Sequence, residues 1–354
     1  MSLLKGKNLT VEISGESHSP EMKMTVKGFP KFKFNLEELS NFLQRRKASS
    51  GVFSTPRKED DEPIFTNVEN GAINGDFEVV IKNNNVKSKD YSDLYGKPRP
   101  SHADYAWFKK DGELNFTGGG RFSARLTAPY CVLGGICKQY LQSLNISVAS
   151  YIQKIGKVEG KSYRDGEISY GEIESLTKDF PSLTNKEKML EEIISAKTSG
   201  DSVGGVIETI IYNLPAGVGD NLFEGLEGKI SSMVFSVPAV KGIEFGEGYK
   251  MSESLASEVN DELYYDKNGD IKLKSNNNGG INGGISNGFN VTLRSYIKPT
   301  PSITKEQNTV DLVSGENVKI KIAGRHDSCV AVRAVPCIES AVAIAIVDEI
   351  VGVL

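Results

Sequence analysis

The sequence predicts an α+β fold. Segments that alternate apolar and polar residues, as strands do, are interspersed with helical segments, and no regular β-α-β alternation runs along the chain. No linker or internal repeat divides residues 1–354, so a single domain is expected. With 354 residues, of which 38% are hydrophobic and 25% charged, the chain is long enough to bury a large core.

The elements follow from local patterns in chain order. Strands are expected at residues 9–14, 22–26, 64–68, 77–81, 205–212, 289–296 and 318–322, and helices at 36–46, 123–144, 186–197 and 336–353. Asn35, with Glu38 three residues later, resembles a capping box and marks the first helix start. A strand follows the glycine-rich stretch 276–288 directly, which indicates a structured turn or ligand loop. The long polar stretch 83–101 is typical of a functional or disordered loop.

Composition argues against several classes of protein. A formal net charge of -4 provides no global positive field, so neither nucleic acid nor a membrane surface is an expected partner. The four cysteines form no C-x-x-C pair and are expected to be core thiols, and no zinc-type ligand spacing occurs, so no metal is expected. The N-terminus lacks a signal-peptide pattern and the apolar run at 341–347 is too short to span a bilayer, which favours the cytoplasm.

Histidine and arginine are concentrated in a few polar stretches. The three histidines, His18, His102 and His326, each lie among small or charged residues, and eight of the ten arginines lie in these or similar stretches. Arginine binds carboxylate and phosphate through a bidentate fork, whereas lysine is the general surface charge. A net-acidic chain that gathers its arginines in this way is predicted to bind a polyanion.

Each feature also has a simpler interpretation. A lone histidine is more often a hydrogen-bonded structural residue than a catalyst. Arg45 and Arg46 at a helix end could equally complement the helix dipole. The glycine triplet 118–120 could be a tight turn or could present backbone N–H groups to an anion, and no Walker or dinucleotide-binding pattern accompanies it.

Several blocks in order resemble the chorismate synthase family. They include Gly15-Glu16-Ser17-His18, Arg99-Pro100 with His102-Ala103-Asp104-Tyr105, Gly118-Gly119-Gly120-Arg121, and Arg325-His326-Asp327. The resemblance runs from residue 9 to the C-terminus. It implies helices sandwiched between antiparallel β-sheets, a homotetramer, and one FMN per subunit. The implied reaction is the elimination of phosphate and a C6 hydrogen from 5-enolpyruvylshikimate 3-phosphate, giving chorismate in the shikimate pathway of aromatic amino acid biosynthesis.

The resemblance also implies roles for particular residues. In this family the removal of phosphate requires reduced FMN, although the reaction has no net redox change. NADPH is a candidate indirect reductant. The flavin could be reduced by an external reductase or by an intrinsic activity of the protein. His18 would protonate the leaving phosphate, His102 would stabilise the reduced flavin anion, and Asp327 with Ser17 would move the flavin N5 proton. Substrate anions would meet Arg46, Arg57, Arg125 and Arg333. Flavin contacts are implied for Arg121, Ser123, Ala239, Gly283, Lys298, Pro299, Thr300, Pro301, Ser302 and Arg325, whereas His326 is open between a direct and a supporting role.

Six positions depart from the family pattern, and two other functions compete with this one. Departures occur at Ser19, Val52, Ser101, Phe122, Pro238 and Ser328, and replacing glycine by serine is costly only where φ is positive. One alternative is a divergent flavin-binding homologue with altered or lost activity. Another is a nucleic-acid or other anion-binding module, which the net charge of -4 disfavours.

Overall fold

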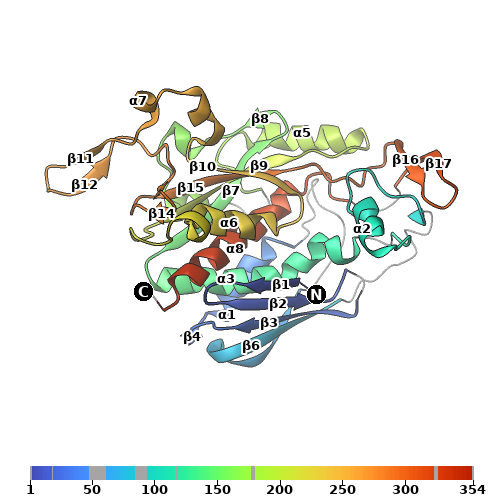
Figure 1. Ribbon diagram of the computed structural model, residues 1–354, viewed down its shortest axis with the longest axis horizontal. Helices are drawn as coiled ribbons and strands as arrows, with labels where there is room; N and C mark the ends of the chain where they lie inside the picture. Colours follow the sequence, from blue (N-terminus) through green and yellow to red (C-terminus); the bar gives the residue numbers. More distant parts are fainter. Residues whose placement is uncertain are drawn as a thin grey trace.

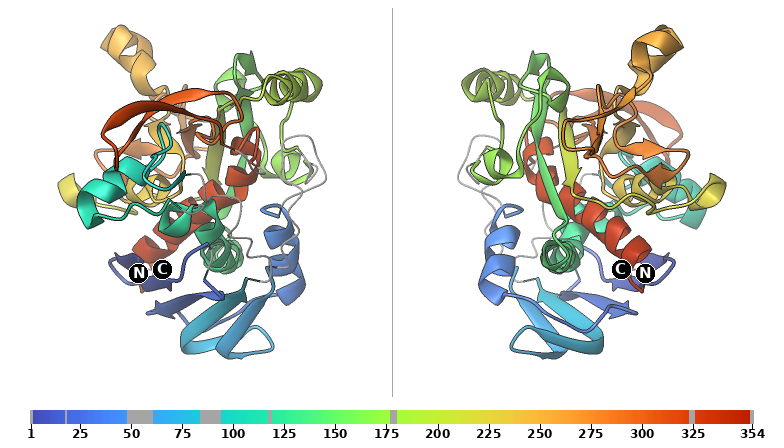
Figure 2. Two further views of the ribbon diagram at one scale, coloured as in Figure 1. Left: turned by 90° about the vertical axis from the view of Figure 1, so that its right-hand side faces the viewer. Right: turned by 90° about the vertical axis from the view of Figure 1, so that its left-hand side faces the viewer.

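The computed structural model describes residues 2–17, 19–47, 61–83, 94–116, 119–176, 180–322 and 326–352. Two antiparallel sheets enclose a layer of helices (Figure 1), which confirms the predicted α+β class with helices sandwiched between sheets. Figure 2 shows the same layers from either side. Within the described ranges, no helix combines the length and apolarity needed to cross a bilayer.

The first sheet forms one outer layer. Its order is β1-β2-β3-β6-β4, with β5 also paired to β6. The strands are β1 (Ser2–Lys5), β2 (Thr10–Ser14), β3 (Glu21–Lys27), β4 (Phe32–Lys33), β5 (Pro63–Glu69) and β6 (Ala72–Lys82). In β3 the burial alternates, with Met22, Met24 and Val26 facing the core, as expected for a sheet with one face in solvent.

The second sheet has the order β10-β15-β9-β7-β8. Its strands are β7 (Ser147–Ile155), β8 (Val158–Glu159), β9 (Gly205–Tyr212), β10 (Val240–Phe245) and β15 (Val291–Ile297). β7 and β9 are buried along nearly their whole length, because helices cover both faces of this sheet. A separate apolar cluster, which includes Tyr151, Ile168 and Ile173, fills the outer face.

The helical layer centres on α3 (Thr127–Ser143) and α8 (Ala331–Ile350), which pack against each other between the sheets. The close approach depends on Gly134, because a Cβ there would lie 2.1 Å from the Ser340 Cβ. Nearly every residue of α8 is buried, as expected for a helix that is apolar on all sides. The other helices are α1 (Leu36–Gln44), α2 (Asp104–Asp111), α4 (Tyr170–Glu174), α5 (Lys186–Thr198), α6 (Leu226–Phe235) and α7 (Ala256–Val259).

Short turns and hairpins complete the described chain. The 3-10 helices are η2 (Gly120–Phe122), η3 (Ala124–Leu126), η4 (Tyr163–Asp165), η5 (Leu222–Glu224) and η6 (Gly248–Glu253). The hairpins are β11 (Leu263–Tyr265) with β12 (Ile271–Leu273), β13 (Ile281–Asn282) with β14 (Ile285–Ser286), and β16 (Gln307–Asp311) with β17 (Glu316–Ile320). The glycine-rich stretch 276–288 therefore contains a hairpin and is no flexible linker.

Two helices begin at different residues from those predicted, and both differences affect the site. The helix predicted from residue 123 starts at Thr127, because Ser123 is extended and its Oγ accepts a hydrogen bond from the Arg125 N–H at 3.1 Å. The C-terminal helix was predicted to begin at Pro336, but it begins five residues earlier at Ala331 and contains this proline. Arg333 consequently lies in the first turn of α8.

Candidate functional site

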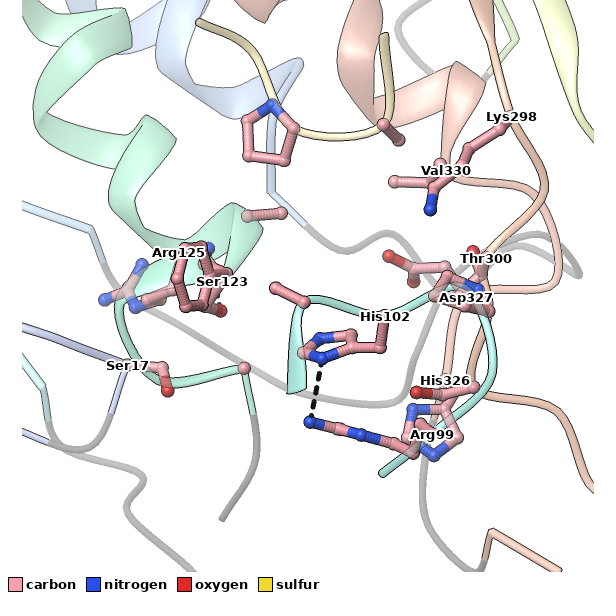
Figure 3. Close-up of a pocket in the computed structure, with 18 of the residues that line it drawn as sticks. Ser17, Arg99, His102, Ser123, Arg125, Lys298, Thr300, His326, Asp327 and Val330 are labelled. Atoms are coloured by element: carbon pink, nitrogen blue, oxygen red, sulfur yellow. Dashed lines mark hydrogen bonds between the residues drawn. The ribbon is translucent and has the colours of Figure 1, made fainter. Parts of the chain in front are cut away.

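Loops from both sheets and from the helical layer meet around one cavity of 520 Å³ (Figure 3). This volume is typical of a small-molecule site. Its walls come from the β2–β3 turn, the end of α1, the segment before α2, η2 and η3, the link from α6 to β10, the segment after β15, and the start of α8. Among the described residues, six cationic side chains line it: Arg46, Arg99, Arg121, Arg125, Lys298 and Arg333.

A buried carboxylate links two of these arginines. Asp61 accepts hydrogen bonds from Arg46 through one oxygen and from Arg125 through the other, and the exposed fractions of the three residues are 5%, 3% and 8%. Burial alone would raise the pKa of Asp61, but the two guanidinium groups outweigh burial and hold that pKa below its usual range. Arg125 also donates to the Asn83 side chain at 2.9 Å. The two guanidinium groups are thus held in place beside the cavity.

Arg333 connects this pair to the opposite wall. Its Nε donates to the carbonyl of Arg46 at 3.0 Å, and its Nη1 donates to Asp327 Oδ2 at 3.0 Å. Arg333 lines the cavity from the first turn of α8. The contacts place three proposed anion-binding arginines in one network.

His102 is held by an arginine–carboxylate pair. The side chain of Asp104 lies 2.5 Å from the His102 ring, measured from Oδ1 to Nδ1, and Arg99 donates to Asp104 Oδ1 and Oδ2 at 2.8 and 2.7 Å. Burial would raise the pKa of Asp104, but hydrogen bonds and charge from Arg99 and His102 prevail and lower it to about 2. Asp104 is therefore ionised at neutral pH.

Lys298 joins two strained backbone segments at the cavity wall. Its Nζ donates to the Ser101 carbonyl at 2.6 Å, and its backbone N–H donates to the Ala239 carbonyl at 2.9 Å. Ser101 and Ala239 have φ values of +59° and +74°, in the region that normally favours glycine. Burial, together with nearby Lys241, lowers the pKa of Lys298. Such strain is often concentrated at functional sites.

The glycine-rich turn places Arg121 over an aromatic ring. Its guanidinium carbon lies 4.4 Å from the centre of the Trp107 ring, a cation–π contact, and Phe122 packs edge-on against the same ring at 5.5 Å. The Ser17 N–H donates to the Gly120 carbonyl at 3.2 Å. This bond attaches the β2–β3 turn to η2.

Two buried hydroxyl groups at the cavity have no hydrogen-bond partner within the described residues. They are Ser17 Oγ and Thr300 Oγ1. A buried polar group without a partner is costly, so such groups indicate where a polar ligand would bind. Hydroxyls that can donate or accept, next to fixed cations, fit the ring heteroatoms and phosphate of a flavin nucleotide. Within the described ranges, no cluster of three or more histidine, cysteine or carboxylate side chains could hold a metal ion.

Most of the predicted site residues that the structure describes lie together. The cavity is lined by Ser17, Arg46, His102, Arg121, Ser123, Arg125, Ala239, Lys298, Thr300, Pro301, Ser302, Asp327 and Arg333. His326 also lines it. Pro299 and Gly283 do not: Pro299 lies against Gly204, and Gly283 forms the turn between β13 and β14. His18, Arg57 and Arg325 lie outside the described residues.

Sequence patterns missed several contributors. Arg99, Ser236 and Val330 line the cavity, and Asp61 and Asp104 hold its charged groups, although none was assigned a role. Asp104 follows His102 by two residues, a spacing that could have suggested a partner. Asp61 gave no such signal, since its partner Arg125 is 64 residues away.

The departures from the family pattern now have local explanations. Ser19 is absent from the positive-φ residues, and its Oγ accepts from the Glu16 N–H at 2.8 Å, so it is compatible with the turn. Ser101 does occupy a positive-φ position and is the strained substitution. Phe122 packs on Trp107, and Pro238 lines the cavity. Nothing in the structure explains Ser328, and Val52 lies outside the described residues.

Fold and site together are those of an enzyme with a cation-lined cavity between two antiparallel sheets, of a size and charge suited to small anionic molecules. The model of a family described as chorismate synthase matches residues 9–351. The chain is 40% identical to a chorismate synthase of Methanocaldococcus jannaschii, over 97% of this chain and 94% of that protein. It is 41% identical to one of Methanococcus maripaludis, over 98% and 96%. A crystal structure titled chorismate synthase is similar in fold, with a TM-score of 0.72 and 24% identity, over 98% of this chain and 93% of that one.

The chain belongs to the chorismate synthase family. Its function is the formation of chorismate, and its enzyme class is the carbon–oxygen lyases that act on phosphates. None of the matches favours the alternative of a homologue with altered or lost activity.

Proposed function

We propose that the cavity binds reduced FMN and 5-enolpyruvylshikimate 3-phosphate side by side and converts the ester to chorismate and phosphate. In this reaction the C3–O bond breaks with its electron pair leaving on phosphate, the C6 hydrogen leaves overall as a proton, and the electron pair of the C6–H bond supplies the additional carbon–carbon double bond. The observation that carries the proposal is that six cationic side chains of the described residues gather around one 520 Å³ cavity. Two polyanions next to each other require such a set of fixed cations.

The residues divide into two groups by position. Arg46 and Arg125, joined by Asp61, and Arg333, which donates to the Arg46 carbonyl, would bind the phosphate and carboxylates of the substrate, with Arg57 as a further candidate. The flavin would contact Arg121, Ser123, Ala239, Lys298, Thr300, Pro301 and Ser302, with Pro299, Gly283 and Arg325 as further candidates. When bound, reduced flavin would lend electron density to the substrate ring and recover it, so that no net redox change results.

Four side chains would handle protons. His102 lines the cavity and would place positive charge beside the reduced flavin, while His18 would protonate the departing phosphate. Asp327 and Ser17 line the same cavity and would carry the proton of flavin N5. The unpartnered Ser17 hydroxyl is available for this, since no described residue accepts its hydrogen bond.

Anaerobic turnover tests this function. The protein with reduced FMN and the ester should release one phosphate per chorismate, change the flavin absorbance only when substrate is present, and consume no reductant per turnover. Replacing His102 or His18 by alanine should lower turnover by about 10²-fold or more. The matched control Tyr105→Phe lies three residues from His102 on exposed α2 surface and should leave turnover unchanged. Near-normal turnover in a histidine variant would remove that residue from the mechanism.

We also propose a homotetramer of single-domain subunits in the cytoplasm. One apolar cluster contains residues from Leu9 to Ile350, which supports a single domain. Leu222 and Phe223 are 87% and 93% exposed, and Tyr265 is 73% exposed, so apolar surface is available for subunit contacts. The sulfur atoms of Cys131 and Cys337 lie 3.7 Å apart as thiols, which suits a reducing compartment. Light scattering would measure the assembly size.

We propose that the flavin is reduced from outside the protein, with NADPH as the indirect electron source. Turnover under anaerobic conditions with oxidised FMN and NADPH should then require an added flavin reductase. Turnover without one would show an intrinsic NADPH-dependent activity instead.

A further inference from the structure

Asp104 is the one carboxylate that the described residues place against the His102 ring. Its Oδ1 lies 2.5 Å from His102 Nδ1, and the exposed fraction of Asp104 is 5%. Arg99 holds the carboxylate with three hydrogen bonds. Its backbone N–H and Nε donate to Oδ2 at 2.9 and 2.7 Å, and its Nη2 donates to Oδ1 at 2.8 Å. The carboxylate therefore has a single orientation, with Oδ1 directed at the imidazole.

These contacts decide which ring nitrogen carries the proton. His102 Nδ1 also lies 3.1 Å from Arg99 Nη2, the contact drawn in Figure 3. If Nδ1 lacked a hydrogen, its lone pair would face the carboxylate oxygen at 2.5 Å, which is repulsive. With a hydrogen on Nδ1, the ring donates to Asp104 and Arg99 donates to the same oxygen. The second arrangement satisfies every group.

We propose that Asp104 is a positioning residue that keeps the proton of His102 on Nδ1, so that Nε2 is the atom presented to the ligand in the cavity. The consequence for catalysis rests on the proposed function, because only there does Nε2 meet the reduced flavin. The tautomer itself does not depend on it.

Nitrogen-15 NMR of the histidine side chains tests the proposal without substrate or flavin. With three histidines in the chain, His102 is assignable from a His102 variant. The wild-type spectrum should show His102 protonated at Nδ1 when the ring is neutral. A neutral ring protonated at Nε2 would overturn the proposal, and this result needs no variant to fold.

The variant Asp104→Asn makes the test stricter. Arg99 directs two donors at the Oδ2 position and one at the Oδ1 position, which favours the amide oxygen at Oδ2 and turns the NH₂ group toward His102 Nδ1. His102 should then change to the Nε2–H form, because the amide NH₂ donates to the Nδ1 lone pair. Asp111→Asn, an exposed substitution on the same helix, is the control and should leave the tautomer unchanged. An unchanged tautomer in Asp104→Asn would contradict the proposal.

Turnover separates this inference from the proposed function. Asp104→Asn should lower the rate constant of the anaerobic reaction by about 10²-fold while flavin still binds. If the wild type does not turn over but its NMR spectrum shows the Nδ1 tautomer, the proposed function fails and the inference stands. If the wild type turns over and the tautomer is Nε2–H, the inference fails alone.

Discussion

Replacing Asp61 by asparagine should destabilise the protein and increase the stabilisation that a bound anion provides. Asp61 lies between Arg46 and Arg125, and all three residues are at most 8% exposed. Removing one member of a buried ion pair costs about 3–5 kcal/mol, because the remaining charge is left without a partner. Asparagine keeps the shape and one acceptor, so we expect the lower end, about 3 kcal/mol. At roughly 2 °C per kcal/mol for a chain of this size, Tm should fall by about 6 °C.

The same variant connects stability to binding. With Asp61 neutral, the two guanidinium groups lack their internal counter-charge, so an added phosphate ester should restore part of the loss. The rise in Tm on adding the substrate should therefore be larger in Asp61→Asn than in the wild type, measured by thermal denaturation at several ligand concentrations. Asp76→Asn, at an exposed position of β6, is the matched control.

The sign of the pH dependence of the Asp61 contribution to stability follows from its pKa. The pKa of Asp61 is lower in the folded state, so its contribution is fully present above the unfolded value near 3.8 and is lost as pH falls through the folded pKa. The difference between wild type and variant should hold from pH 5 upward and shrink in stronger acid. A variant whose Tm stays within about 1 °C of the wild type at pH 7 would refute this account of the arginine pair.

Three further substitutions follow from single contacts. Ser101→Gly should raise Tm by about 1–2 °C. Relieving a φ of +59° gains about 1–2 kcal/mol of folding free energy, and the greater conformational freedom of glycine in the unfolded chain offsets about half of that gain. A lower Tm would contradict the proposed strain at Ser101. Glu339→Gln should lower the free energy of unfolding by about 3 kcal/mol, because it leaves Arg45 and Lys138 facing a neutral group. An unchanged midpoint in thermal or urea denaturation would contradict this. Thr300→Val should leave the stability of the ligand-free protein unchanged or higher, because the Thr300 hydroxyl has no partner there. The same variant should bind FMN about 10-fold more weakly in a fluorescence titration. Unchanged FMN affinity would show that the Thr300 hydroxyl does not contact the flavin.

Patterns with a local cause were predictable from the sequence. Asn35 caps α1 as expected, because its side chain accepts hydrogen bonds from the Glu37 and Glu38 N–H groups. The predicted capping box is not formed, because the Asn35 N–H donates to the Gln139 side chain and not to Glu38. The helix-containing α+β architecture and α5 were also predicted closely. By contrast, β7 was missed, because its buried residues show no alternation when helices cover both faces of the sheet.

Features that depend on distant partners were not predictable by pattern. The start of α8 was misplaced because a proline usually marks the first turn, whereas Pro336 lies inside this helix and its carbonyl accepts from the Ser340 hydroxyl at 2.7 Å. Many of the residues that line the cavity were predicted from ordered motifs, but their charge partners were not. Asp61 and Asp104 acquire their importance only when folding places arginine and histidine side chains around them.

A crystal structure with oxidised FMN and 5-enolpyruvylshikimate 3-phosphate would test the central claim most directly. We expect both molecules in one cavity, with the ester phosphate or a carboxylate within hydrogen-bond distance of Arg125, the flavin near Thr300 and Lys298, and His102 Nε2 directed at the ligands. Density for either molecule at a separate surface, with this cavity filled only by water, would contradict it.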